Sequence, residues 1–294
     1  MIQYPPEIQT LLRALYSEEG RYYHGMNHIK YLLANARTWF TATSELQTYQ
    51  LLQHAIWWHD AVYSVFDKPG RNEIESATLF SKLHTQGKFT LDVSGMDEGT
   101  AAWHVWSAIH ATARHLEDID FTDYFWTADT IGRKVAMLML DVDLSVFAEE
   151  LDMVKHHSEL VLQEYEPFGK SRESMLEGRI SFLKKLLERK RIFYTDFFYE
   201  RCEQKARFNL QDSIEATEEE LEDIRTPYPR VMFERPTYDR EMASNPLRYS
   251  PSKRFTNHAG LRGWVINQGD VWRLDFDDGT SWYVGNIDNL TIEE

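Results

Sequence analysis

Apolar residues recur at helical spacing over most of the chain. Pro5-Pro6 favours a helix start, and the apolar positions that follow it up to Leu15 are three or four residues apart. Further stripes and buried apolar runs of this kind predict additional helices, with Asn72 as the N-cap of one of them. The predicted helices cover residues 6–15, 26–39, 51–58, 73–86, 97–116, 128–147, 145–165, 171–189 and 196–214.

The pattern changes in the last quarter of the chain. Glu215 to Asp223 is acidic, and the proline-containing segment 226–229 interrupts the helical spacing. Beyond residue 256, short runs of aromatic and β-branched residues alternate with turns that contain Gly, Asn and Asp, which predicts strands. These strands are expected at residues 264–266, 271–276, 281–284 and 290–292.

Together the patterns predict a mainly α protein with three parts. Residues 1–224 form a helical bundle, residues 225–256 a linker, and residues 257–294 a small C-terminal antiparallel β-barrel similar to SH3-like or Tudor-like modules. So small a module needs most of its aromatic residues for its own core. It is expected either to pack on the main domain or to serve a protein partner or self-association.

Composition and charge narrow the class of protein. Of the 294 residues, 43% are hydrophobic, and Cys202 is the only cysteine, which excludes an intramolecular disulfide. Neither a signal peptide nor a long uncharged apolar run is visible, so we expect a cytoplasmic protein without membrane contact. The formal charge of −15 argues against a nucleic-acid partner, because phosphate contacts need clustered Lys and Arg.

The segment Trp57-Trp58-His59-Asp60 is the first candidate for chemistry. It ends an apolar run that starts at Leu51, so the histidine and the aspartate are expected to be buried. A buried ionisable pair is costly unless its charge is compensated, and a divalent cation does this. The alternative is structural, with an aspartate that caps a helix end and a histidine bonded to a backbone carbonyl.

Two further pairs strengthen the metal interpretation. His24 and His28 are four residues apart, a spacing that lets side chains on one helix converge. Asp141 and Asp143 end the apolar run 135–140, which predicts a second burial of charge. Two residues apart on a helix, these aspartates point about 200° from each other, so at most one should reach a metal.

Several short motifs follow one another along the chain. They are Arg21-Tyr22-Tyr23-His24 with His28, Trp58-His59-Asp60-Ala61-Val62-Tyr63, Asn72-Glu73 with Ser76-Ala77, Ala111-Thr112 with His115, and Asp141-Val142-Asp143-Leu144. In this order they resemble the HD-superfamily metal-dependent phosphohydrolases, in particular a bacterial branch. Several ordered motifs are far more specific than any one of them. The similarity covers residues 7 to 214 and leaves out the β module.

The resemblance implies a role for each matching residue. The implied ligands of one or two divalent ions (Mn, Zn, Fe, Co or Mg) are His28, His59, Asp60 and Asp143, with Asp141 as the alternative to Asp143. His24 would protonate the leaving group, and Glu73 would hold a water or a ligand in place. The implied phosphate contacts are Arg21, His115 and Arg179.

The expected function is metal-dependent hydrolysis of a phosphate ester, with a nucleotide or a related small phosphorylated metabolite as substrate. The metal would activate water for attack on phosphorus, and His24 would supply a proton to the leaving oxygen. One alternative is an HD-type di-iron oxygenase, for which His84 and His110 are the candidate extra ligands. The other is a non-catalytic scaffold that acts through the β module.

Overall fold

The computed structural model describes residues 2–65, 70–121 and 130–225, together with β-strands between residues 253 and 292. The chain divides into two compact units, Met1–Leu221 and Glu222–Glu294, which are described separately below. Residues 226–252, most of the predicted linker, lie outside the described part of the chain.

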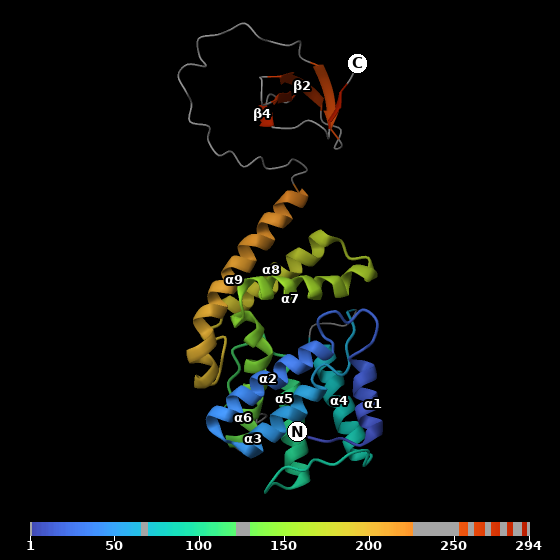
Figure 1. The fold of residues 1–294 in the computed structure, drawn as a ribbon, viewed down its shortest axis with the longest axis vertical. Coiled ribbons are helices and arrows are strands. Elements are labelled where there is room, and N and C mark those ends of the chain that lie inside the picture. Colours follow the sequence, from blue (N-terminus) through green and yellow to red (C-terminus); the bar gives the residue numbers. More distant parts are fainter. Residues whose placement is uncertain are drawn as a thin grey trace. The chain divides into compact units, whose positions relative to one another are not determined.

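The first unit is built from helices (Figure 1). They are α1 (Pro6–Leu15), α2 (Met26–Thr43), α3 (Leu46–Trp58), α4 (Arg71–Thr85), α5 (Glu98–Thr112), α6 (Thr130–Leu144), α7 (Leu151–Tyr165), α8 (Arg172–Glu188) and α9 (Asp196–Arg225), with short 3-10 turns η2 (Ser145–Ala148) and η3 (Glu166–Phe168). The predicted mainly α class is confirmed. Among the helices in the described ranges, none is both long and apolar enough to cross a membrane.

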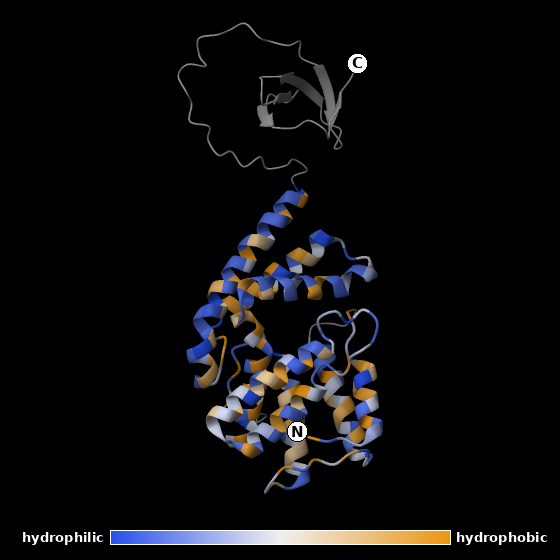
Figure 2. Ribbon diagram, viewed as in Figure 1, coloured by the Kyte–Doolittle hydropathy of each residue, from blue (hydrophilic) through white to orange (hydrophobic). Residues whose placement is uncertain are grey.

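The core lies where α3, α5 and α6 meet. Helix α5 packs against α3, α4 and α6, and α2 packs against α3. Leu51, Ile56 and Ile109 are fully buried there, because each comes from the apolar face of its helix. Figure 2 shows hydrophobic residues alternating with hydrophilic ones along these helices, and mainly hydrophilic residues in the last turns of α9.

Helices α7 and α8 add a second, smaller core. Leu162, Met175, Leu176, Ile180 and Leu221 form a separate buried cluster that joins these two helices to α9. The α7–α8 pair therefore has its own hydrophobic support.

Two helix ends differ from the prediction in ways that affect the site. Helix α4 begins at Arg71 after Gly70, whose φ of 80° suits glycine, so Asn72 is inside the helix and is not its N-cap. Helix α5 ends at Thr112, and His115 lies in the turn that follows it. Asn72 thereby faces the loop that contains Ser64, and His115 faces Asp143 in α6.

The second unit contains an antiparallel sheet with the strand order β4-β3-β2-β1-β5. Its strands are β1 (Lys253–Asn257), β2 (Arg262–Asn267), β3 (Trp272–Phe276), β4 (Ser281–Val284) and β5 (Leu290–Ile292). Strand β1 falls largely within the predicted linker, because its sequence KRFTN has no apolar alternation. Its place comes from pairing with β2 on one side and β5 on the other.

His54 is a buried histidine that serves the core. It lies in α3, and its Nδ1 is 2.6 Å from the Tyr4 hydroxyl, which also accepts a hydrogen bond from Trp58 Nε1. Burial lowers the pKa of His54 to about 3, so the imidazole stays neutral in the folded protein.

We predict that His54 makes the helical unit sensitive to acid. The unfolded chain takes up a proton at His54 below pH 6.5 and the folded protein does not, so this stability is lost as the pH falls from 6.5 toward 3. Between about pH 7 and pH 5, the free energy of unfolding should fall by about 2 kcal/mol more in wild type than in His54→Gln. Denaturant titrations at both pH values measure this, and equal losses in the two proteins would contradict it.

Candidate metal centre

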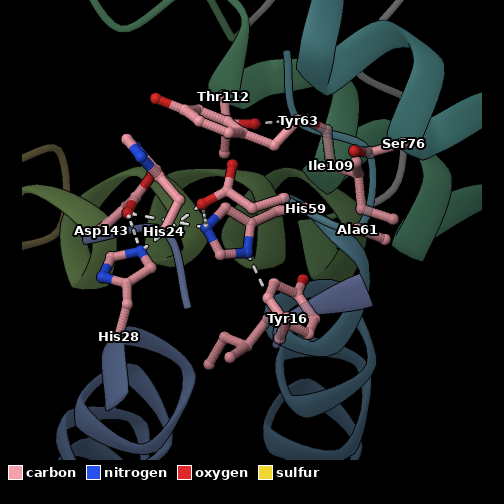
Figure 3. A network of polar contacts seen from close by, with 12 residues as sticks. Tyr16, His24, His28, His59, Ala61, Tyr63, Ser76, Ile109, Thr112 and Asp143 are labelled. Atoms are coloured by element: carbon pink, nitrogen blue, oxygen red, sulfur yellow. Dashed lines mark hydrogen bonds and ion pairs between the residues drawn. The ribbon is translucent and has the colours of Figure 1, made fainter. Parts of the chain in front are cut away.

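Three side chains from three different helices meet at one point (Figure 3). His28 lies in the first turn of α2, His59 directly follows α3, and Asp143 lies near the end of α6. One ligand atom from each lies within 4.8 Å of the others. His28 Nε2 is 3.1 Å from Asp143 Oδ1, and His59 Nε2 is 3.8 Å from the same oxygen.

Asp60 completes the cluster. Its Oδ2 is 2.9 Å from His59 Nε2 and 3.7 Å from His28 Nε2. A single ion bound at about 2.0–2.2 Å from each ligand requires separations between ligand atoms of this size. Two imidazole nitrogens and carboxylate oxygens form a donor set that suits Zn, Mn, Fe and Co.

The buried nitrogens of the cluster also fit a metal. His28 Nε2 and His59 Nε2 are buried, and although carboxylate oxygens lie close to both nitrogens, neither contact has the geometry of a hydrogen bond. His59 Nδ1 donates to the Ile56 carbonyl at 3.0 Å, and this tautomer leaves the lone pair on Nε2 available to a metal ion. The group His28, His59 and Asp143 can therefore hold one metal ion.

The charges of the cluster favour an added cation. Burial acts against the ionised form of Asp143, but His59 outweighs it and holds the pKa of Asp143 well below its usual range. Asp60 behaves in the same way, again mainly because of His59. Burial acts to lower the pKa of His59, yet the two carboxylates raise it to about 9. A proton on the His59 imidazole thus balances negative charge that a divalent ion would balance instead.

Asp141, the alternative to Asp143, does not reach the cluster. It is fully buried, and its carboxylate accepts hydrogen bonds from the Tyr194 and Thr195 amides and from the Thr195 hydroxyl at 2.6 to 2.8 Å. These donors lie just before α9, so Asp141 anchors the start of that helix. The sequence placed both aspartates at the buried end of α6, and the structure gives each a different set of partners.

Arg21, a predicted phosphate contact, binds backbone oxygens instead. Its Nη1 donates to the Asp60 carbonyl at 2.6 Å, and its Nη2 donates to the Ala61 carbonyl at 3.1 Å. The side chain is only 3% exposed and does not line the cavity described below. Arg21 therefore fixes the turn that carries His59 and Asp60, and the predicted contact with phosphate does not fit this position.

The loop after Asp60 is held by α4. Ser76 Oγ accepts from the Val62 amide at 2.9 Å, and Asn72 exchanges two hydrogen bonds with the backbone of Ser64. Asn72 and Ser76 are four residues apart and so lie on one face of the helix. This face explains why the motif needs both residues, although the predicted capping role of Asn72 was wrong.

His24 lies just before α2, beside the cluster. Its ring is 6.1 Å from that of His28, and Tyr63 stacks on it at 4.3 Å. Its Nδ1 is 2.6 Å from Glu164 Oε2, while the Tyr23 and His24 amides donate to Glu164 Oε1. Tyr63 adds a fourth hydrogen bond to this fully buried carboxylate.

Glu164 sets the protonation of His24. Burial acts to lower the pKa of His24, but the hydrogen bond and the charge of Glu164 outweigh it, and the pKa is raised. His24, beside the cluster, therefore keeps its proton to a higher pH than a free imidazole does. The sequence gives no sign of this pairing, because Glu164 lies in an amphipathic helix and is 140 residues from His24.

A cavity of about 630 Å³ opens above the cluster, a size typical of small-molecule sites. His24, Asp60, Glu73 and Asp143 line it, and so do side chains from α7 and α8, including Arg179. His157 on α7 also lines it, with a buried Nδ1 that lacks a hydrogen-bond partner. His157 belongs to none of the motifs in the sequence, so sequence reasoning does not find it.

His115 and Glu73 lie on the cavity side of the cluster. His115 Nε2 is 2.8 Å from Asp143 Oδ2, the carboxylate oxygen that does not face His28. Burial, and next the charge of Asp60, raise the pKa of Glu73, whose Oε2 is buried without a hydrogen-bond partner. Both predicted residues are thus near the cluster, and His115 orients a ligand residue.

The extra ligands of an oxygenase lie elsewhere. His84 Nε2 is 3.1 Å from Glu98, and the His110 ring packs 5.1 Å from that of Trp106. Neither histidine lines the cavity. This arrangement gives no support to the di-iron alternative.

Comparison with known proteins finds no protein-family model that matches the chain and no curated protein that is similar to it in sequence. The inference of function therefore depends on the cluster, its neighbours and the cavity.

We predict that substitution of Asp143 affects mainly metal binding, whereas substitution of Asp141 affects mainly the stability of the fold. Asp143→Asn should weaken binding of Mn²⁺ or Zn²⁺ by about 100-fold or more, because one ligand is lost, with little loss of stability. Asp141→Asn should retain the metal but lower the free energy of unfolding by about 1–3 kcal/mol, because buried donors lose their partner. Metal titration calorimetry and denaturant unfolding of both variants measure this. If Asp141→Asn instead lost the metal and Asp143→Asn lost only stability, Asp141 would be the ligand.

Proposed function

We propose that the helical unit is an HD-type phosphohydrolase that uses a divalent metal to hydrolyse a phosphate ester. The observation that carries this proposal is the cluster of His28, His59, Asp60 and Asp143 at one side of a cavity, with the histidine that is paired with Glu164 beside it. The order of motifs along the sequence supports the same class. A nucleotide or another small phosphorylated metabolite matches the cavity volume.

The residues of the cluster would hold the metal. A bound divalent ion supplies an activated water and withdraws charge from a phosphoryl oxygen. Asp60 and Asp143 contribute the negative charge that retains the ion, while His59, fixed by the Ile56 carbonyl, presents its Nε2. His115 keeps the Asp143 carboxylate in position through its second oxygen.

His24 would be the general acid. The leaving oxygen of an alkyl ester needs a proton, and the His24–Glu164 pair holds one beside the cavity. Because Nδ1 of His24 binds Glu164, its Nε2 is the nitrogen available to the substrate. Glu73, with its raised pKa and unpartnered oxygen, is placed to hold a water near Asp60.

The β unit would serve as a separate recognition module. Strand β1 pairs with both β2 and β5, a connection that suits closure into an SH3-like barrel. We assign to it binding of a protein partner or self-association, and no part in the chemistry.

We predict that His24 matters most for poor leaving groups. With Mn²⁺ or Co²⁺ bound, wild type should hydrolyse both 4-nitrophenyl phosphate and alkyl phosphates such as nucleoside monophosphates. His24→Gln should lower kcat for the alkyl esters by about 10²–10⁴-fold, and much less for the nitrophenyl ester, whose anion leaves without a proton.

The control for this prediction is His84→Gln, which changes a histidine outside the cavity. It should leave both rates unchanged. Equal losses on the two esters in His24→Gln would remove the general-acid role. A wild-type protein that binds metal and hydrolyses no ester would refute the hydrolase.

We predict that Glu164 controls the alkaline limb of the pH–rate profile. A general acid is active only while protonated, so the rate falls as the pH rises through the pKa of His24, which Glu164 raises. Glu164→Gln removes the charge, lowers this pKa and should move the limb toward acid. Glu159→Gln, on the same helix but paired with Arg172, should leave the profile unchanged. If the alkaline limb of the pH–rate profile did not move in Glu164→Gln, control of the His24 pKa by Glu164 would be contradicted.

A further inference from the structure

Arg179 on α8 is a cation without a carboxylate partner among the described residues. Its Nη2 donates to the Ser158 hydroxyl on α7 at 2.6 Å. Its guanidinium carbon lies 5.6 Å from the ring centroids of Phe147 and Phe182, and its Nε is buried without a hydrogen-bond partner. Burial lowers the pKa of Arg179 to about 10, which still leaves it charged at neutral pH. A fixed guanidinium with unused donors suits a phosphate or carboxylate.

Arg179 lines the same cavity as the metal cluster but is set apart from it. Tyr23 lies between them, with its ring 4.8 Å from that of His28. Burial and then Asp143 raise the pKa of Tyr23, and Arg179 opposes them, so this hydroxyl senses both charge centres. The ion-pair partners of Asp60 and Asp143 are histidines, and Arg179 is not among them. The guanidinium therefore lines the cavity without an ion pair to either aspartate.

The wall that carries Arg179 is basic, whereas the opposite wall is acidic. Lys170 and Lys185 line the cavity from the α7–α8 side, and neither has an ion pair among the residues that the structure describes. Apolar side chains, among them Val146 and Leu162, line it as well. The cavity thus offers an acidic metal end, apolar surface and a basic end.

We propose that Arg179 is the centre of a second phosphate subsite, so that the substrate class is a phosphate ester that carries a further phosphate group away from the reacting one. The position of the reacting phosphate rests on the proposed function, but the subsite does not. The lysines on the same wall favour a doubly charged phosphate over a carboxylate. A nucleoside bisphosphate has the required form: two phosphates joined by a body that can contact apolar surface.

A structural role for Arg179 makes a different prediction. If the residue served to join α7 to α8 through Ser158, its removal would lower stability. If Arg179 is kept for ligand binding, its buried charge without a carboxylate partner destabilises the fold. Methionine removes that charge and retains the packing between Phe147 and Phe182. Arg179→Met should therefore be at least as stable as wild type toward heat. A clear loss of thermal stability in this variant would favour the structural role and overturn the proposal.

The direct test is binding of inorganic phosphate to the full-length protein after removal of metal, followed by titration calorimetry. Without metal, phosphate has no ion to bind at the cluster, so we expect the phosphate that still binds to occupy the Arg179 subsite. We expect Arg179→Met to weaken it about tenfold or more, as for loss of a charged hydrogen-bond donor, and Arg179→Lys to weaken it less. Arg172→Met, on the same helix but outside the cavity, and Asp143→Ala should bind phosphate no more weakly than wild type.

Kinetics provide the second readout. The ratio of kcat/KM for a nucleoside 3′,5′-bisphosphate to that for the matching 5′-monophosphate should exceed one in wild type and fall about tenfold in Arg179→Met. The rate on the monophosphate itself should change little. Arg172→Met should retain the wild-type ratio.

The two experiments separate this proposal from the proposed function. Phosphate binding that depends on Arg179, in a protein that hydrolyses no ester, would retain the subsite and refute the hydrolase. Hydrolysis with unchanged selectivity and unchanged phosphate binding in Arg179→Met would retain the hydrolase and refute the subsite. Phosphate binding that is unchanged in Arg179→Met but stronger in Asp143→Ala would place the anion at the cluster and also refute the subsite.

Discussion

The burial of negative charge at the meeting point of α2, α3 and α6 is the constraint on which the rest of the helical unit depends. Asp60 is buried and the Asp143 side chain is only 16% exposed, and carboxylates in such positions stay ionised only with donors or a cation close by. Two imidazoles meet this need directly. Residues around them then fix the backbone: Arg21 binds the carbonyls of the Asp60 turn, and Ser76 holds the loop that follows.

Much of the cluster could be predicted from the sequence, since the signal was local. A His-Asp pair directly after an apolar run, and two aspartates after another, indicate charge that enters a core. Helical spacing likewise located α1 to α9, with errors mainly at the ends. Asn72 shows the reason for such errors. Its side chain suits a cap, but Gly70 supplied the required backbone angle two residues earlier.

The partners of the site could not be predicted, because they depend on contacts between distant segments. Asp141 and Asp143 follow the same apolar run in the sequence. Hydrogen bonds from the distant segment that contains Thr195 distinguish Asp141 from the cluster residue Asp143. Arg21 was expected to contact phosphate because guanidinium suits it, yet backbone carbonyls use the same donors. The fold around Arg21 decides whether its guanidinium binds phosphate or backbone carbonyls, and a short sequence motif does not contain that information.

The four hydrogen bonds of Glu164 have a consequence for how the site is assembled. They join the segment before α2, the loop before α4 and helix α7, which are far apart along the chain. The candidate metal ligands all come from residues up to 143, so they can gather while the chain is still being synthesised. His24 obtains its proton-retaining partner only after α7 has emerged and docked. The metal-ligand cluster and the His24–Glu164 pair are therefore complete at different points of synthesis, because the pair needs a helix that follows all the candidate ligands in the sequence.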